Sequence, residues 1–556
     1  MTSIPQNEAD RLFQVGRIMG MGGNRRDLLK AAFAAGLIPV LTLADVAEQA
    51  AAQEGEPVQG GTFFTLGHQD ITKLSPEDNG ADVVFANLMQ LFNGMYYIDH
   101  NYQLVPSLAE SYEVSEDGLT YTFKLKTGIT FHNGDSFSSA DVKYTFDWIM
   151  NPDNGSTRAG NFDLVASVEA PDETTVVVTL STVDVSFLVN VLPIHIYPSA
   201  YHAEVGEEAF GAAPIGTGPF YLADSADYSP AAFLELQAYE GHFNGRPNFD
   251  TWRMDIAPEA AGRFVALQSG AADNSVWTLS SEDNHTLADG GGFTVYTALS
   301  VGVNHLPLNN NHPFLSDKQA RKALITGLDR AATLEAVYLG DGELATSNLS
   351  PAAGDFYNPD VTAYPYDPEA AATLLEEAGW VAGGDGIREK DGVKASFVIT
   401  AIAGDTQRRP IAEIAQALWS ELGIDVSIEE AQVGDILATL PNGELDASLF
   451  NWTYGGGNGE PDARDTLGTG GPNNFSQFSN ARVDELLALG VTQQDLTERQ
   501  ATYHEIQAIV ADEVPFVFNA FPINYTFYNE RVKGLPESVL SSLYILQNAY
   551  KLWKVE

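Results

Sequence analysis

The chain has 556 residues, several times the length of a typical domain, and 44% of them are hydrophobic, so we expect a large buried core divided over two or more lobes. Acidic residues outnumber basic ones by 75 to 29, and the formal charge of −46 argues against nucleic acid or an anionic lipid surface as the main partner, because both repel such a field. The absence of cysteine excludes disulfides, thiolate metal sites and cysteine nucleophiles.

Residues 1–52 have the pattern of an export signal. Arg25 and Arg26 precede an uncharged apolar stretch at 31–44, and small residues at 50–52 follow in the spacing that signal peptidase requires. The arginine pair followed by Leu-Leu-Lys resembles a bacterial twin-arginine signal. The alternative is a short membrane anchor, but the apolar stretch is shorter than the roughly 20 residues that span a bilayer. We therefore expect a soluble mature protein outside the cytoplasm.

Strand and helix patterns alternate along the rest of the chain. Residues 121–126 alternate apolar and polar side chains, as a half-buried strand does, and 174–180 form a β-branched run typical of a strand buried on both faces. Between them, the cap at 138–141 predicts a helix that ends before Pro152. The second half continues with strands predicted at 395–401, 424–428 and 515–518 and helices predicted at 367–379, 410–422 and 495–512. This alternation predicts open α/β sheets.

No catalytic or nucleotide-binding motif is present. The chain lacks the G-x-x-x-x-G-K-[ST] phosphate loop, the G-x-S-x-G elbow and the H-E-x-x-H metal motif. Its ten histidines are scattered, so structural histidines are favoured over a metal site. We expect a protein without a cofactor that is not an enzyme.

The strongest candidates for ligand contact are aromatic residues beside a glycine loop. Trp452, Thr453 and Tyr454 follow an apolar run at 447–450 and precede the sequence Gly-Gly-Gly-Asn-Gly at 455–459. This order places the rings at a strand end, where open α/β sheets bind ligands. The alternative is that Trp452 is an ordinary core residue.

Several segments together resemble the extracytoplasmic solute-binding proteins of ABC importers, in the group of dipeptide-, oligopeptide- and nickel-binding proteins known as family 5. The signature lies in residues 104–125, 128–134 and 140–142. Further matches are found at 216–220, 309–324, 366–371, 418–426 and 513–515. The similarity covers essentially everything from residue 60 to residue 535.

The resemblance implies an α/β fold of two lobes, the class II type of periplasmic-binding-protein fold, with an extra subdomain inserted in the first lobe. It implies lobe I at 53–303 with the subdomain at about 88–175, lobe II at 304–520, and a return to lobe I at 521–556. The ligand would be enclosed between the lobes, and a membrane permease would read the closed form. A monomer in the periplasm, with a small-molecule or peptide ligand and the permease complex as partners, is expected.

One departure from the family concerns the ligand. Peptide-binding members carry an Asp shortly after the tryptophan, and it pairs with the peptide α-amine; glycines occupy that place here. Either Glu460 or Asp462 takes this role, or the ligand has no free amine, because a buried unpaired ammonium is costly.

Other candidates complete the predicted site. Arg408 and Arg409 lie near the position where peptide binders place a carboxylate-binding arginine, and the alternative for both is a solvated pair flanking a helix. The full candidate set is Trp452, Thr453, Tyr454, Gly457, Glu460, Asp462, Arg408, Arg409 and Asn304.

Peptide is the default ligand class. An oligosaccharide or another polar organic solute comes second, because aromatic rings and a neutral loop suit a sugar, and a nickel chelate comes third. A secreted glycoside hydrolase is a remote alternative, and a binding protein that serves a signalling receptor would share every feature above.

Overall fold

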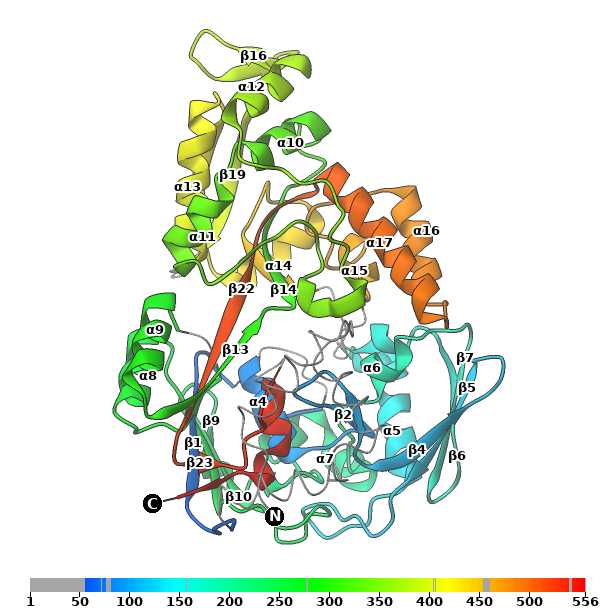
Figure 1. Ribbon diagram of the computed structural model, residues 1–556. Helices are drawn as coiled ribbons and strands as arrows, with labels where there is room; N and C mark the ends of the chain where they lie inside the picture. Colours follow the sequence, from blue (N-terminus) through cyan, green and yellow to red (C-terminus); the bar gives the residue numbers. More distant parts are fainter. Residues whose placement is uncertain are drawn as a thin grey trace, which may run out of the picture. The chain divides into compact units, whose positions relative to one another are not determined.

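The computed structural model describes residues 56–71, 73–76, 82–156, 158–276, 279–403, 405, 407–453, 461–539 and 543–555 (Figure 1). The predicted export signal at 1–52 lies outside these residues. Within them, no helix combines the length and the apolar character needed to cross a membrane.

A mixed sheet of eleven strands runs through the part of the chain that starts at Val58. Its main path follows the order β21 (Phe450–Thr453), β14 (Gly302–Pro307), β22 (Phe516–Asn529), β12 (Asn274–Ser275), β1 (Thr62–Gly67), β11 (Thr251–Ile256), β10 (Phe233–Ala238) and β8 (Phe220–Tyr221). The long strand β22 pairs with β14 over 516–520 and with β13 (Phe293–Leu299) over 523–529 (Figure 1). The first and second halves of β22 therefore pair with different strands.

The four largest hydrophobic clusters group the elements into two lobes. Lobe I, as named here, is built on a cluster around Trp252, whose indole stacks on Phe63 with the ring centroids 5.0 Å apart, and on a second cluster around Phe123. Lobe II is built on clusters around Trp419 and Tyr503. The chain finally returns to lobe I, where η6 (Leu543–Lys551) packs against α4 (Asp82–Leu91).

The cluster around Phe123 belongs to a separate antiparallel sheet, formed by β4 (Ala109–Val114), β5 (Thr120–Leu125), β7 (Thr175–Leu180) and β6 (Val165–Asp172). Helix α5 (Ser139–Met150) packs on this sheet, and it begins with the expected capping box between Ser138 and Asp141. The short helix α6 (Phe187–Val191) contributes Phe187 and Val191 to the same cluster. This unit is the extra subdomain of the first lobe.

Lobe II alternates helices and strands, as the sequence predicts. Its main elements are α10 (Lys318–Thr326), α11 (Arg330–Tyr338), α12 (Pro368–Glu377), β19 (Ser396–Ile402), α13 (Arg408–Glu421), β20 (Asp425–Ala431), α15 (Arg464–Leu467), α16 (Ala481–Gly490) and α17 (Leu496–Glu513). Strands β19 and β20 pair in parallel, with α13 as their connection. The strand predicted at 515–518 is only the first part of β22, which continues to Asn529.

A signature segment, 128–134, and one of the further matching segments, 216–220, meet in lobe I through His132. The N–H of Gly216 donates to Nδ1 of His132 over 3.1 Å, and Nε2 of the same ring donates to the carbonyl of Gly218 over 3.0 Å. Burial lowers the pKa of His132 to about 4, so the ring stays neutral and can hold both bonds near pH 7. Residues 128–134 and 216–220 are therefore joined through this ring, both of whose nitrogens have partners within the protein.

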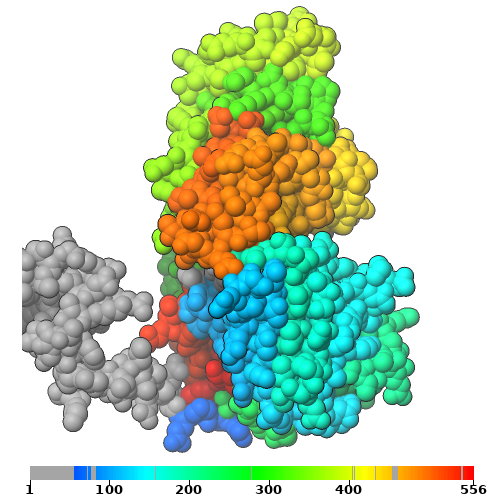
Figure 2. Space-filling model, turned by 90° about the vertical axis from the view of Figure 1, so that its right-hand side faces the viewer, coloured from blue at the N-terminus to red at the C-terminus, as the bar shows by residue number. Residues whose placement is uncertain are grey.

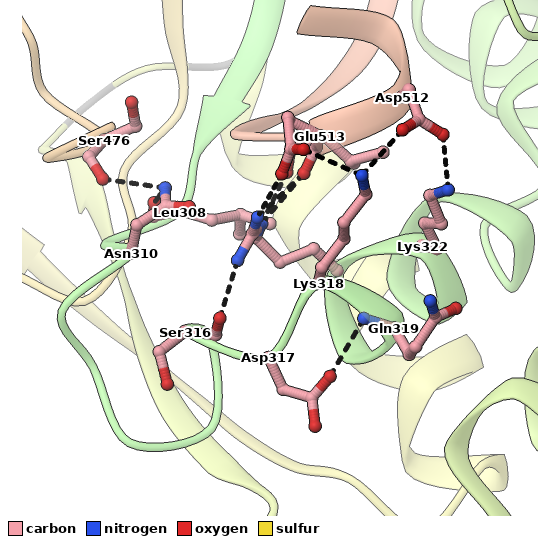
Figure 3. Close-up of polar contacts among 12 residues, drawn as sticks. Leu308, Asn310, Ser316, Asp317, Lys318, Gln319, Lys322, Ser476, Asp512 and Glu513 are labelled. Atoms are coloured by element: carbon pink, nitrogen blue, oxygen red, sulfur yellow. Dashed lines mark hydrogen bonds and ion pairs between the residues drawn. The ribbon is translucent and has the colours of Figure 1, made fainter. Parts of the chain in front are cut away.

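Two of the further matching segments, 309–324 and 513–515, meet in lobe II, between α10 and the end of α17. Arg321 is 4% exposed, and its guanidinium donates to four backbone carbonyls, those of Leu315, Ser316, Glu513 and Val514, at 2.8–3.2 Å. Around it, Lys318 and Lys322 pair with Asp512 at 2.6 Å each (Figure 3). The arginine thus satisfies the free carbonyls at the C-terminus of a helix.

Candidate ligand-binding site

The carboxyl ends of three strand segments in lobe II lie at one edge. β19 and β20 run in parallel, and an isolated parallel bridge joins Ile399 of β19 to Ala447, just before β21. The first turn of α13 follows β19 at this edge, where the Asp405 carboxylate accepts the N–H of Arg408 over 2.7 Å. In open α/β sheets this edge is the usual ligand position.

Trp452 and Thr453 are at the end of β21, as predicted. The indole of Trp452 is partly buried, and its ring meets that of Phe475 edge to face with the centroids 5.1 Å apart. Trp452 therefore combines a packing role with partial exposure, while Thr453 is exposed. The candidates Tyr454, Gly457 and Glu460 lie outside the described residues.

Asn304 is fully buried and is connected to the site through a hydrogen bond to Asn451. Its Nδ2 donates to Oδ1 of Asn451 over 2.7 Å, and its Oδ1 accepts from Nδ2 of Asn519 over 3.0 Å. Asn451 is exposed beside Trp452 on β21. Asn451 is not among the predicted site residues, although strand alternation indicates it: with Phe450 and Trp452 facing a core, the residue between them faces the opposite side.

Arg408 and Arg409 both have acidic partners near the start of α13. The Arg408 side chain pairs with Asp405, and Arg409 pairs with Glu413 over 2.9 Å and with Glu430. This is the helix-flanking arrangement given above as their alternative. A ligand carboxylate would have to replace one of these partners.

Asp462 is held by Arg464 in a two-pronged contact. Nε and Nη2 of Arg464 lie 2.9 and 2.6 Å from the two carboxylate oxygens. Burial alone would raise the pKa of Asp462, but the bonds from Arg464 outweigh it and hold that pKa below its usual range. The charge of Asp462 is thus balanced within the protein, and a ligand amine would have to compete with Arg464 for this carboxylate.

A metal centre finds no support in the described part of the chain. Among those residues, no group of three or more His, Cys, Asp or Glu side chains is placed to hold an ion.

The chain matches a known protein family over more than half of its length. The family of bacterial extracellular solute-binding proteins, family 5 (middle region), matches residues 103–474. The chain belongs to this family. The match confirms the predicted family. Together with the relatives and solved structures below, it also confirms the two-lobed α/β fold and the role of solute-binding component of an ABC importer, acting outside the cytoplasm.

Individual relatives span nearly the whole chain. The oligopeptide-binding protein AppA of Bacillus subtilis is 27% identical over 90% of this chain and 92% of its own length. The heme-binding protein A of Haemophilus influenzae is 29% identical over 82% and 85%. The solved structure of the Bacillus subtilis AppA with a nonapeptide superposes with a TM-score of 0.80 at 26% identity, covering 90% of this chain and all of that one.

Proposed function

We propose that this protein captures a peptide between lobes I and II and delivers it to an ABC permease. The single observation that carries the ligand class is the similarity to an oligopeptide-binding protein over 90% of the chain. The exposed end of β21, with Thr453 and Asn451, supplies an edge where an extended backbone can bond. Closure would then follow from contacts that the ligand makes with both lobes at once.

The proposal includes the predicted organisation of the chain. Lobe I would comprise 53–303 and 521–556, and lobe II 304–520. The protein would be a monomer in the periplasm, exported by a twin-arginine signal.

The second candidate is a ligand without a free amine, such as an oligosaccharide or a heme-like solute. Glycines stand where peptide binders carry their amine-pairing Asp, and Asp462 is neutralised by Arg464. The similarity to a heme-binding protein points the same way. A nickel chelate ranks lower, because no ligand cluster occurs among the described residues.

Native mass spectrometry of the mature protein, purified gently from its own host, separates these candidates. A ladder of bound short peptides would support the proposal, and Glu460 or a backbone carbonyl would then be the candidate partners for the peptide amine. A discrete saccharide, heme or metal-chelate mass would overturn the peptide assignment.

Replacing Trp452 by alanine should weaken binding of the co-purified ligand at least tenfold, because the partly exposed indole would be lost from the site. The ligand-free protein should lose a few degrees of melting temperature as well, since the ring also packs on Phe475. Titration calorimetry and thermal unfolding measure the two effects. Phe475→Leu is the matched control: if it weakens binding as much, Trp452 acts only through packing.

Replacing Arg25 and Arg26 together by lysine should leave unprocessed precursor in the cytoplasm, because the twin-arginine pathway reads the pair itself. Immunoblots of cell fractions measure the outcome. Normal export of this variant would refute the twin-arginine assignment and leave the other secretory route in its place.

A further inference from the structure

The carboxylate of Asp184, on the inserted subdomain of lobe I, is held in place by hydrogen bonds. Asp184 precedes α6, and its Oδ1 accepts the backbone N–H and the hydroxyl of Ser186 over 2.8 and 2.6 Å. The Asp184 side chain is 10% exposed. Its second oxygen, Oδ2, faces lobe II.

Arg464 of lobe II contacts the Asp184 carboxylate. It starts α15, whose Leu467 belongs to the cluster around Tyr503 in lobe II. Its Nη2 lies 3.3 Å from Oδ2 of Asp184 and 3.1 Å from Oγ of Ser186. Burial alone would lower the pKa of Arg464, but Asp462 and Asp184 raise it, so the guanidinium stays charged.

A second contact between the lobes lies beside the first. The N–H of Val185 donates to the carbonyl of Val491, after α16, over 2.8 Å. Nearby, Gly118 lies so close to the side chain of Gln494 that a Cβ on the glycine would come 2.4 Å from the amide nitrogen. Figure 2 shows the surface of the α16–α17 region resting on that of the subdomain.

Each side of this contact is also held by a partner within its own lobe. Arg464 is fixed within lobe II by Asp462, and Asp184 is fixed within lobe I by Ser186, so joining them orders little additional side chain. On separation of the lobes, Arg464 would keep Asp462 as its partner, whereas Asp184 would lose this arginine as its cationic partner and keep the bonds from Ser186. Charge-assisted bonds between prearranged groups are among the stronger contacts in proteins.

We infer that Asp184, Ser186 and Arg464 form a latch that favours the closed arrangement of the lobes even without ligand. The inference rests on the proposed capture between lobes. Arg464 is then a positioning residue: it touches no ligand, but it sets the fraction of molecules that are closed. Since apparent affinity scales with the fraction of binding-competent protein, loosening the latch should weaken binding of any ligand by the same factor.

The ligand-free protein provides the direct test. The chain has no cysteine, so spin labels can be attached at Asp153→Cys in the subdomain and Val381→Cys in lobe II, both at exposed positions. Double electron–electron resonance then gives the distribution of distances between the two spin labels, and so between the lobes. Arg464→Met, Asp184→Asn and the double variant are compared with Arg482→Met, an exposed arginine that pairs with Glu485 and Glu505 within lobe II.

Both single latch variants should move the distribution to longer distances, the double variant should move it no further, and Arg482→Met should match the parent protein. Unchanged distances in both Arg464→Met and Asp184→Asn would overturn the latch. With trialanine as probe, the latch variants should bind about tenfold more weakly through faster dissociation. Absence of trialanine binding in the parent protein would count against the proposed peptide ligand and leave the distance result standing.

Discussion

Replacing Gly216 or Gly218 by alanine is expected to prevent lobe I from folding correctly. A Cβ on Gly216 would come 2.0 Å from the carbonyl oxygen of Leu91, and one on Gly218 would come 2.3 Å from that of Gln90. Both obstacles are backbone atoms of α4, which cannot move aside as a flexible side chain would. Overpacking a core commonly costs about 1–3 kcal/mol, and a clash between backbones should exceed that range.

Urea unfolding of the mature protein measures this loss, and the yield of soluble protein measures it where the variant does not fold. Gly262→Ala is the matched control, because Gly262 lies inside helix α8 (Ala260–Gln268) with no atom within 4 Å of the new Cβ. That substitution should stabilise the helix by about 0.5–1 kcal/mol. Normal stability of both Gly216→Ala and Gly218→Ala would contradict the close approach.

Replacing Arg321 by methionine is expected to destabilise lobe II by about 3 kcal/mol or more, because each buried polar group left without a partner costs roughly 1–3 kcal/mol. The methionine keeps much of the apolar stem but cannot donate to the four carbonyls that the guanidinium satisfies. Val514, whose φ of 49° lies in the left-handed region, would also lose the bond to its carbonyl. The helix α17 should therefore fray at its C-terminus.

Hydrogen exchange followed peptide by peptide locates this effect, since protection should fall around 505–516 and in α10 more than in lobe I. Lys322→Met is the control on the same helix. It removes an ion pair with Asp512, a carboxylate that is half exposed, and should cost less than about 1 kcal/mol. Equal losses in the two variants would show that the buried bonds of Arg321 add nothing beyond its charge.

Local signals in the sequence were sufficient to predict most individual helices and strands. The capping box at Ser138 and Asp141 gave the start of α5, and the alternation at 121–126 gave β5 to within one residue. These features depend on neighbours within a few positions, which a sequence displays directly. The family signature, in turn, indicated the two lobes.

Long-range partners could not be predicted in the same way. The strand predicted at 515–518 extends to Asn529 because β13 and β15 (Gly342–Leu344) pair with its second part, although Asn519 and Pro522 interrupt its apolar pattern. Asp462 looked available for a ligand amine, yet Arg464 holds it and joins it to Asp184, which lies 280 positions from Arg464 in the sequence. No spacing rule connects such residues.

The return of the chain to lobe I sets an order of events during synthesis. The carbonyl of Leu546 in η6 accepts a hydrogen bond from Nε2 of Gln90 over 3.0 Å. Nζ of Lys554 lies 2.6 Å from the carboxylate of Asp273, whose side chain is 2% exposed. A ribosome therefore makes all the elements of lobe II before it makes the residues that complete lobe I. Gln90 and the early elements of lobe I can thus reach their final packing only after residues more than 450 positions later have been made.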